Sequence, residues 1–140
     1  MKTYAYAVAG LLLVLAVQPG RSEAKAPPAP AYSHEFDACI ARANAMDAAM
    51  ASCEGEEFMR QDKALNGVYK TLTAKLEPDR LEALRQSERL WVQFRDAECK
   101  WQSSAEAGGT AGPVNEEGCL MSMTADRVKE LQAELKAETF

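Results

Sequence analysis

The sequence predicts an all-α domain, a small helical hairpin or bundle of three to four helices stapled by two disulfides. Three observations support this fold class. From Ser33 onward the chain is rich in Ala, Leu, Glu, Lys, Arg and Met, which are good helix formers. Its apolar residues recur at helical spacing and do not alternate as they do in strands. Four cysteines follow a leader typical of exported proteins, in which cysteines usually pair.

Residues 1–24 are predicted to be a secretory signal peptide. Lys2 precedes an uncharged apolar run over residues 5–17, and the small residues Ser22 and Ala24 favour cleavage after Ala24. The run is too short to cross a hydrocarbon layer of about 30 Å. We therefore expect a periplasmic or secreted protein with no membrane span after the signal is removed.

The mature chain is predicted to be a spacer followed by one domain. Residues 25–32 contain three prolines among alanines and favour extended conformations, and residues 33–140 form the helical domain. The full chain has a net charge of −5. Loss of Lys2, Arg21 and Glu23 with the signal brings this to −6. Binding to nucleic acid requires the opposite charge, so it is excluded as a function.

The first two helices are expected to be capped by Ser33 and Asn44. Ser33 begins a short helix through about Ala43, and Asn44 begins a longer one through Leu76. The longer helix carries an apolar stripe suited to a core. Its members are Phe58, Leu65, Val68, Tyr69, Leu72 and Leu76.

The second half of the domain is expected to contain two more helices. Pro78 suits the first position of a helix that runs to about Gln102 and packs antiparallel against the preceding one. Residues 103–117 hold three glycines and a proline and predict a loop. The last helix spans roughly Cys119 to Ala137. The apolar stripe of the third helix is Leu81, Leu84, Leu90, Trp91, Phe94, Ala97 and Trp101.

The cysteines predict structural disulfides. Four cysteines allow three pairings, of which Cys39 with Cys53 and Cys99 with Cys119 is preferred. The first pair cannot lie on one straight helix. Fourteen residues at about 1.5 Å each would separate the two cysteines by roughly 21 Å, far beyond the Cα spacing of a disulfide. The short first helix must therefore fold back on the second. The second pair would close the base of the glycine-rich loop.

No catalytic, cofactor or metal site is predicted. The chain has one histidine, His34, and no two cysteines at the spacing of zinc ligands. Neither a phosphate-binding loop nor a dinucleotide fingerprint is present. The adjacent acids Glu56-Glu57 and Glu116-Glu117 diverge on a helix and are interpreted as solvated surface.

Polar residues at the margins of the predicted core suggest a hydrogen-bonded network between helices. These are Asn66, Arg95, Asp96 and Arg127. If the groups are buried they must satisfy one another, and Asp96→Asn should destabilise the fold by a few kcal/mol. The alternative is a set of surface ion pairs that contribute little.

The order of residues along the domain is more specific than its composition. The relevant positions are Cys53, Asp62, Leu65, Asn66, Tyr69, Trp91, Phe94, Arg95, Asp96, Cys99, Gly108, Gly109, Thr110, Cys119, Thr124, Arg127 and Leu131. With this pattern, the chain from about Cys39 to Leu135 resembles the LprI-like lysozyme inhibitor family. The resemblance implies a small exported helical domain of bacterial origin, and it supplies no catalytic residue.

The resemblance favours a protein that binds and inhibits lysozyme and so protects the bacterial cell wall. An acidic surface would steer it toward a basic lysozyme. The alternative hypothesis is a general envelope interaction or stress module without lysozyme activity. Neither hypothesis specifies an oligomeric state. The candidate partner-binding loop contains Ser103, Gly108, Gly109, Thr110 and Gly112.

Overall fold

The computed structural model describes residues 32–138, which form four α-helices and no strand. The helices are α1 (His34–Ala43), α2 (Asp47–Thr73), α3 (Pro78–Ser104) and α4 (Ala111–Ala137). The predicted all-α fold class is therefore confirmed. The predicted signal peptide, residues 25–31 of the spacer and the last two residues lie outside the described part of the chain.

The chain reverses between α1 and α2 within three residues. Ser33 caps α1 as predicted, because its Oγ accepts a hydrogen bond from the Phe36 N–H at 3.1 Å. The prediction that Asn44 caps the second helix is wrong. Asn44 instead ends α1 with a φ of 55°, in the left-handed region that asparagine adopts more readily than most residues. Helix α2 then begins at Asp47 and ends at Thr73, three residues before the predicted end.

The connection between α3 and α4 is much shorter than predicted. Helix α3 starts with Pro78 in its first turn, as expected, and continues to Ser104. Helix α4 starts at Ala111, eight residues before the expected start at Cys119, so the turn comprises only residues 105–110. Gly112 and Pro113 lie in the first turn of α4. Proline is tolerated there because the first N–H groups of a helix have no partner within it.

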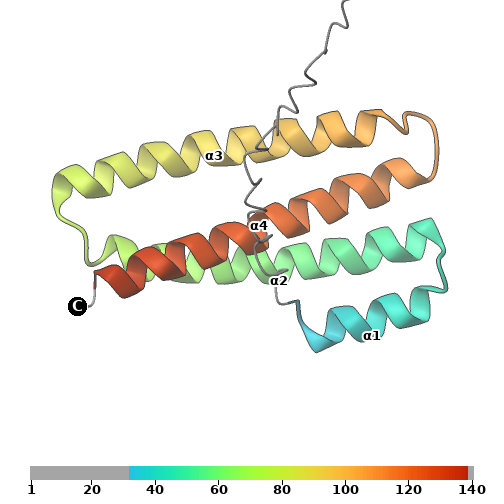
Figure 1. Cartoon of the computed structure of the whole chain (residues 1–140), viewed down its shortest axis with the longest axis horizontal. Helices are drawn as coiled ribbons and strands as arrows, with labels where there is room; N and C mark the ends of the chain where they lie inside the picture. Colours follow the sequence, from blue (N-terminus) through green and yellow to red (C-terminus); the bar gives the residue numbers. More distant parts are fainter. Residues whose placement is uncertain (1–31, 139–140) are drawn as a thin grey trace, which may run out of the picture.

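The hydrophobic core lies between α2 and α4. Leu65 and Leu72 of α2 pack with Val128 and Leu131 of α4, and all four are buried. In Figure 1, α2 and α4 occupy the middle of the molecule, with α1 along one edge and α3 along the other. The core is therefore built by helices distant in sequence.

Helix α3 does not bury the whole apolar stripe that the sequence suggests. Leu84 and Trp91 pack against the core, but Leu90 and Phe94 are each 58% exposed and Trp101 is 69% exposed. The expected packing of α3 against α2 is also wrong, because α3 lies mainly against α4. One principal neighbour covers only one side of a helix, which leaves the other side in solvent.

Candidate functional site

Two short turns lie at the same end of the molecule. Figure 1 shows the α1–α2 turn (residues 44–46) and the α3–α4 turn (residues 105–110) at the end opposite the C-terminus. The Thr110 hydroxyl donates a hydrogen bond to the Asp47 carboxylate, which connects the second turn to the first residue of α2. We call this region, residues 44–47 and 105–110, the paired-turn end.

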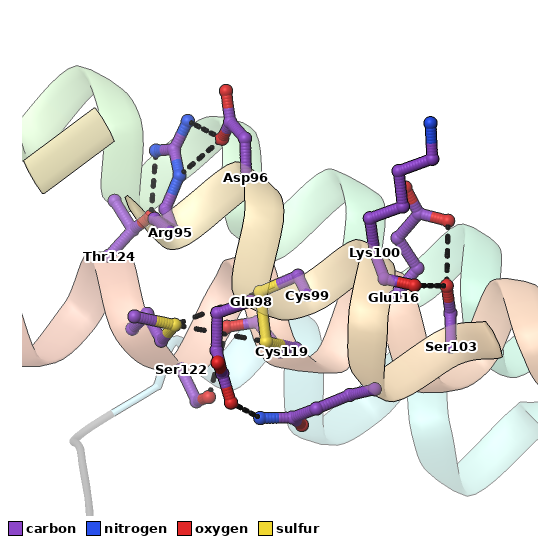
Figure 2. The surroundings of a disulfide bond; sticks show 12 residues. Arg95, Asp96, Glu98, Cys99, Lys100, Ser103, Glu116, Cys119, Ser122 and Thr124 are labelled. Carbon is purple, nitrogen blue, oxygen red and sulfur yellow. Dashed lines mark hydrogen bonds and ion pairs between the residues drawn. A yellow bond between two sulfur atoms is a disulfide. The ribbon is translucent and has the colours of Figure 1, made fainter. Parts of the chain in front are cut away.

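A disulfide lies beneath each turn. Cys39 pairs with Cys53 at a Cα–Cα distance of 5.7 Å, and Cys99 pairs with Cys119 at 5.4 Å, which confirms the preferred pairing. The first bridge joins α1 to α2. The second joins α3 to α4 (Figure 2). The two helices that flank each turn are therefore cross-linked. Cross-links of this loop size contribute about 3 kcal/mol each.

The α3–α4 turn contains only part of the predicted partner-binding loop. Gly108, with a φ of 87°, and Gly109, whose N–H donates to the Glu106 carbonyl at 2.9 Å, lie in the turn itself. Thr110 immediately precedes α4, and Gly112 lies inside that helix. Ser103 lies in the last turn of α3, where its hydroxyl bonds the Lys100 carbonyl at 3.0 Å and Glu116 Oε2 at 3.4 Å (Figure 2). Residues 104–110 are all exposed, as are residues 44–46 of the other turn.

The paired-turn end is acidic. Acidic side chains within the two turns, or within about two helical turns of them, outnumber the basic ones. The acidic residues are Asp37, Asp47, Glu54, Glu98, Glu106, Glu116 and Glu117, and the basic ones are Arg42 and Lys100. This end therefore carries part of the net negative charge of the chain.

Behind the turns, α2 and α4 approach each other through reciprocal Glu–Gly contacts. A Cβ at Gly118 would lie 3.2 Å from Glu54 Oε1, and a Cβ at Gly55 would lie 3.3 Å from Glu117 Oε2. Each carboxylate thus occupies space that the opposite glycine leaves free. Glu54 Oε2 is buried and has no hydrogen-bond partner within residues 32–138. Burial, followed by the charge of Glu117, raises the pKa of Glu54 to about 6.

We expect Glu54→Gln to remove a pH-dependent loss of stability. Because the pKa of Glu54 is about 6 in the folded state, above its ordinary 4.5, the folded state holds this proton more tightly than the unfolded state. Wild-type stability should therefore fall as the pH rises through that window, by about 1 kcal/mol after solvent screening. Urea unfolding at pH 4.5 and 7 should show a smaller fall in Glu54→Gln. The exposed neighbour variant Glu56→Gln should retain the wild-type fall, and equal pH profiles for all three proteins would contradict the assignment.

Arg95 is the centre of a buried polar cluster between α3 and α4. It is only 7% exposed, and its guanidinium donates to Asp96 Oδ1 at 2.7 and 2.9 Å and to Thr124 Oγ1 at 3.2 Å (Figure 2). The same group lies 5.2 Å from the centre of the Trp91 ring and 5.3 Å from that of Phe58. Cation–π contacts and hydrogen bonds together offset the cost of burying this charge.

A second contact of this kind joins Arg127 of α4 to Glu88 of α3. Arg127 also pairs with Glu130 at 2.6 Å, and its guanidinium lies 5.8 Å from the Trp91 ring, so Trp91 contacts two arginines. Burial opposes this charge, but hydrogen bonds from Arg127 to Glu88 and Glu130 outweigh it and raise the pKa of Arg127. Asn66 does not join the network. Its amide bonds Asp62 on the same exposed face of α2.

These positions match a known family model. The model described as "Lysozyme inhibitor LprI" matches residues 39–131, about two thirds of the chain. The match contains both disulfides, the α3–α4 turn and the Arg95 and Arg127 contacts. The chain belongs to the LprI lysozyme inhibitor family.

Two relatives of this LprI-family chain carry no assigned activity. An uncharacterized protein of Rhizobium meliloti is 28% identical over 93 residues, which is 57% of this chain and 67% of the relative. The uncharacterized protein YecT of Escherichia coli is 28% identical over 104 residues, 64% of each chain. The alignment thus spans just under two thirds of YecT. No solved structure matches the LprI-family chain significantly.

Sequence reasoning missed one buried carboxylate of the LprI domain. Glu57 was interpreted as solvated surface, but it is 0% exposed. It accepts hydrogen bonds from the Ser33 hydroxyl at 2.5 Å and backbone N–H at 3.1 Å, and from Arg60 and Gln61 at 2.7 Å each. Its spacing of four from Cys53 was the available signal, because residues i and i+4 share a helix face. Glu57 thereby fixes the start of α1 to α2.

The described part of the LprI-family chain contains no arrangement suited to a metal or a membrane span. Within residues 32–138, no three His, Cys, Asp or Glu side chains come close enough to hold an ion. In the same residues no helix is both long and apolar enough to span a bilayer. Polar groups do converge elsewhere, namely Glu57 with Ser33, Arg95 with Thr124, Arg127 with Glu88, and Glu54 with Glu117.

Proposed function

We propose that this protein is an exported inhibitor that binds lysozyme through its paired-turn end and so protects the bacterial cell wall. The observation that carries the proposal is the geometry of that end. Two turns are joined by the Thr110–Asp47 hydrogen bond, and each has a disulfide beneath it. Membership of a family named for lysozyme inhibition supports the partner class.

The proposed inhibition is steric. A lysozyme must admit a polysaccharide between two carboxyl groups, and a protein that occupies this cleft prevents cleavage without any chemistry of its own. Turns that are already ordered lose little conformational entropy on binding. Gly108 and Gly109 carry no side chain, so the backbone of the α3–α4 turn can approach a partner closely. Periplasmic or secreted localisation, after removal of the proposed signal peptide, is part of this proposal.

Electrostatics supports a basic lysozyme as the target. Asp47, Glu106 and Glu116 place negative charge at or near the proposed contact surface. Complementary charge accelerates association and loses its effect as salt rises. Inhibition is therefore expected to be stronger at low ionic strength.

A charge-reversal pair tests this contact surface. We expect Glu106→Lys/Glu116→Lys to raise the half-inhibitory concentration against a basic lysozyme by roughly tenfold at low salt. The measurement is dose-dependent protection of cell walls from lysis by a panel of lysozymes. Both residues are exposed, so circular dichroism of the variant should match that of the wild type.

The matched control is Glu77→Lys/Glu82→Lys, which changes the net charge equally at the opposite end of the bundle. It should retain most of the inhibition. If both variants lose inhibition equally, net charge alone explains the effect, and the paired-turn end is not the contact surface. No inhibition of any lysozyme by folded wild-type protein would reject the function and favour an envelope interaction module.

A further inference from the structure

The outer face of α3 carries an apolar stripe that none of the other helices within residues 32–138 covers. Leu90 and Phe94 are 58% exposed, Trp101 is 69% exposed, and Ala97 between them is also exposed. Spacings of four, three and four residues place these side chains on one side of the helix. The residues of α3 that pack inward, such as Arg95 and Cys99, lie on a different side. Contiguous apolar surface of this kind is typical of an interaction site.

The stripe has the spacing of a coiled-coil seam. Extending it by one position in each direction reaches Ser87 and Ser104, which gives alternating steps of three and four residues over most of α3. This is the a/d pattern by which one helix packs along another. The natural occupant is therefore a second helix, and the stripe itself indicates which one.

The stripe is complementary to itself in the antiparallel direction. A two-fold axis between Arg95 and Asp96 places Phe94 opposite the partner's Ala97. The same axis places Leu90 opposite the partner's Trp101. Phe94 meets a small side chain, Leu90 and Trp101 form the two outer apolar layers, and the serines close the ends of the seam. Such matching about a two-fold axis is what a symmetric dimer interface requires.

The charge of α3 also favours a second copy. The helix has five acidic and five basic side chains, so the negative charge of the chain resides elsewhere. In the antiparallel register Lys100 flanks the partner's Gln93, and Glu98 flanks the partner's Trp91. No like charges face each other at these flanking positions, so two acidic molecules meet on the helix that has no net charge.

We propose that two copies of this protein associate through antiparallel packing of α3, with Leu90, Phe94, Ala97 and Trp101 of each copy forming the seam. Aromatic side chains bury about 150–250 Å² each. Three large side chains per copy therefore provide less contact than the roughly 1,600 Å² of a standard interface. The dimer is accordingly weak and reversible, with a dissociation constant of roughly 10–100 µM.

Sedimentation of the oxidised protein tests the dimer without any lysozyme present. Wild-type protein should shift from monomer to dimer between about 5 and 500 µM. Ala97→Arg places a long charged side chain against the partner's Phe94 and should weaken association by at least roughly tenfold. The matched control Ala64→Arg adds the same charge at an exposed position of α2 and should dimerise as the wild type does.

A mixing experiment tests the register itself. Phe94→Glu should also be monomeric. An equimolar mixture of Phe94→Glu and Ala97→Arg should associate, because the introduced glutamate of one variant then lies opposite the introduced arginine of the other. The second central layer of this mixed dimer keeps the wild-type pairing of Phe94 with Ala97. Restored association in the mixture supports the antiparallel seam.

Wild-type protein that stays monomeric at about 500 µM overturns the proposal. So does a dimer that Ala97→Arg leaves intact. An Ala97→Arg variant that loses lysozyme inhibition while the wild type is monomeric would show that a different partner occupies this face.

Discussion

Replacing Glu57 with alanine is expected to lower the free energy of unfolding by about 3 kcal/mol at pH 7, because it leaves several partly buried donors without their acceptor. The carboxylate is 0% exposed and accepts hydrogen bonds from Ser33, Arg60 and Gln61. Loss of the bonds from Ser33 should also release the start of α1 from α2. Urea unfolding followed by circular dichroism measures the effect.

The adjacent variant Glu56→Ala is the control, because Glu56 is exposed, and it should change stability by less than about 0.5 kcal/mol. The pH dependence gives an independent check. Burial alone would raise the pKa of Glu57, but the bonds from Ser33, Arg60 and Gln61 outweigh it and hold the pKa below its ordinary value. Its stabilising contribution is therefore present at neutral pH and lost as the pH falls through the folded-state pKa. Equal stability of the two variants at pH 7 would contradict this account.

Arg95→Ala is expected to destabilise the protein by about 3 kcal/mol, since it removes a buried guanidinium together with its packing on two rings. Arg95 donates to Thr124 across the α3–α4 interface and lies between Trp91 and Phe58. Arg95→Lys should recover only part of the loss, because an ammonium cannot reproduce the planar fork. Thermal and urea unfolding measure both variants.

Arg89→Ala is the matched control on the same helix, because Arg89 is 61% exposed and pairs only with the exposed Glu82 in the described residues. It should change stability by less than about 0.5 kcal/mol. Asp96→Asn should lose only about 1 kcal/mol, less than the sequence suggests, because Asp96 is 56% exposed and an amide oxygen still accepts a bond from Arg95. A larger loss from Asp96→Asn than from Arg95→Ala would reverse the roles assigned to the two residues.

Much of the fold could be predicted because helix propensity, capping and cysteine spacing are local properties. Ser33 and Pro78 marked the starts of two helices correctly, and the preferred disulfide pairing is confirmed. The start of α4 was misplaced because glycine and proline end a helix interior but fit its first turn. Asn44 was misassigned because asparagine serves at both ends of a helix.

The candidate site was predictable only in part. The α3–α4 turn and the cysteines that hold it follow from local signals, and Gly108 does occupy a left-handed position there. The approach of residues 44–47 to that turn could not be predicted, because it depends on how α2 packs against α4. The paired carboxylates Glu54 and Glu117 were missed for the same reason, since they lie on different helices.

The sequence by itself determined the helical class, the cross-links and the acidic balance of this protein, because each follows from composition or from spacing along one segment. Tertiary structure decided which apolar residues are buried. Leu90, Phe94 and Trp101 carry the same signal as Leu65 and Leu72, yet the first three are exposed and the last two form the core. Burial requires a neighbouring helix, and α4 packs between α2 and α3 in a position that no local pattern specifies.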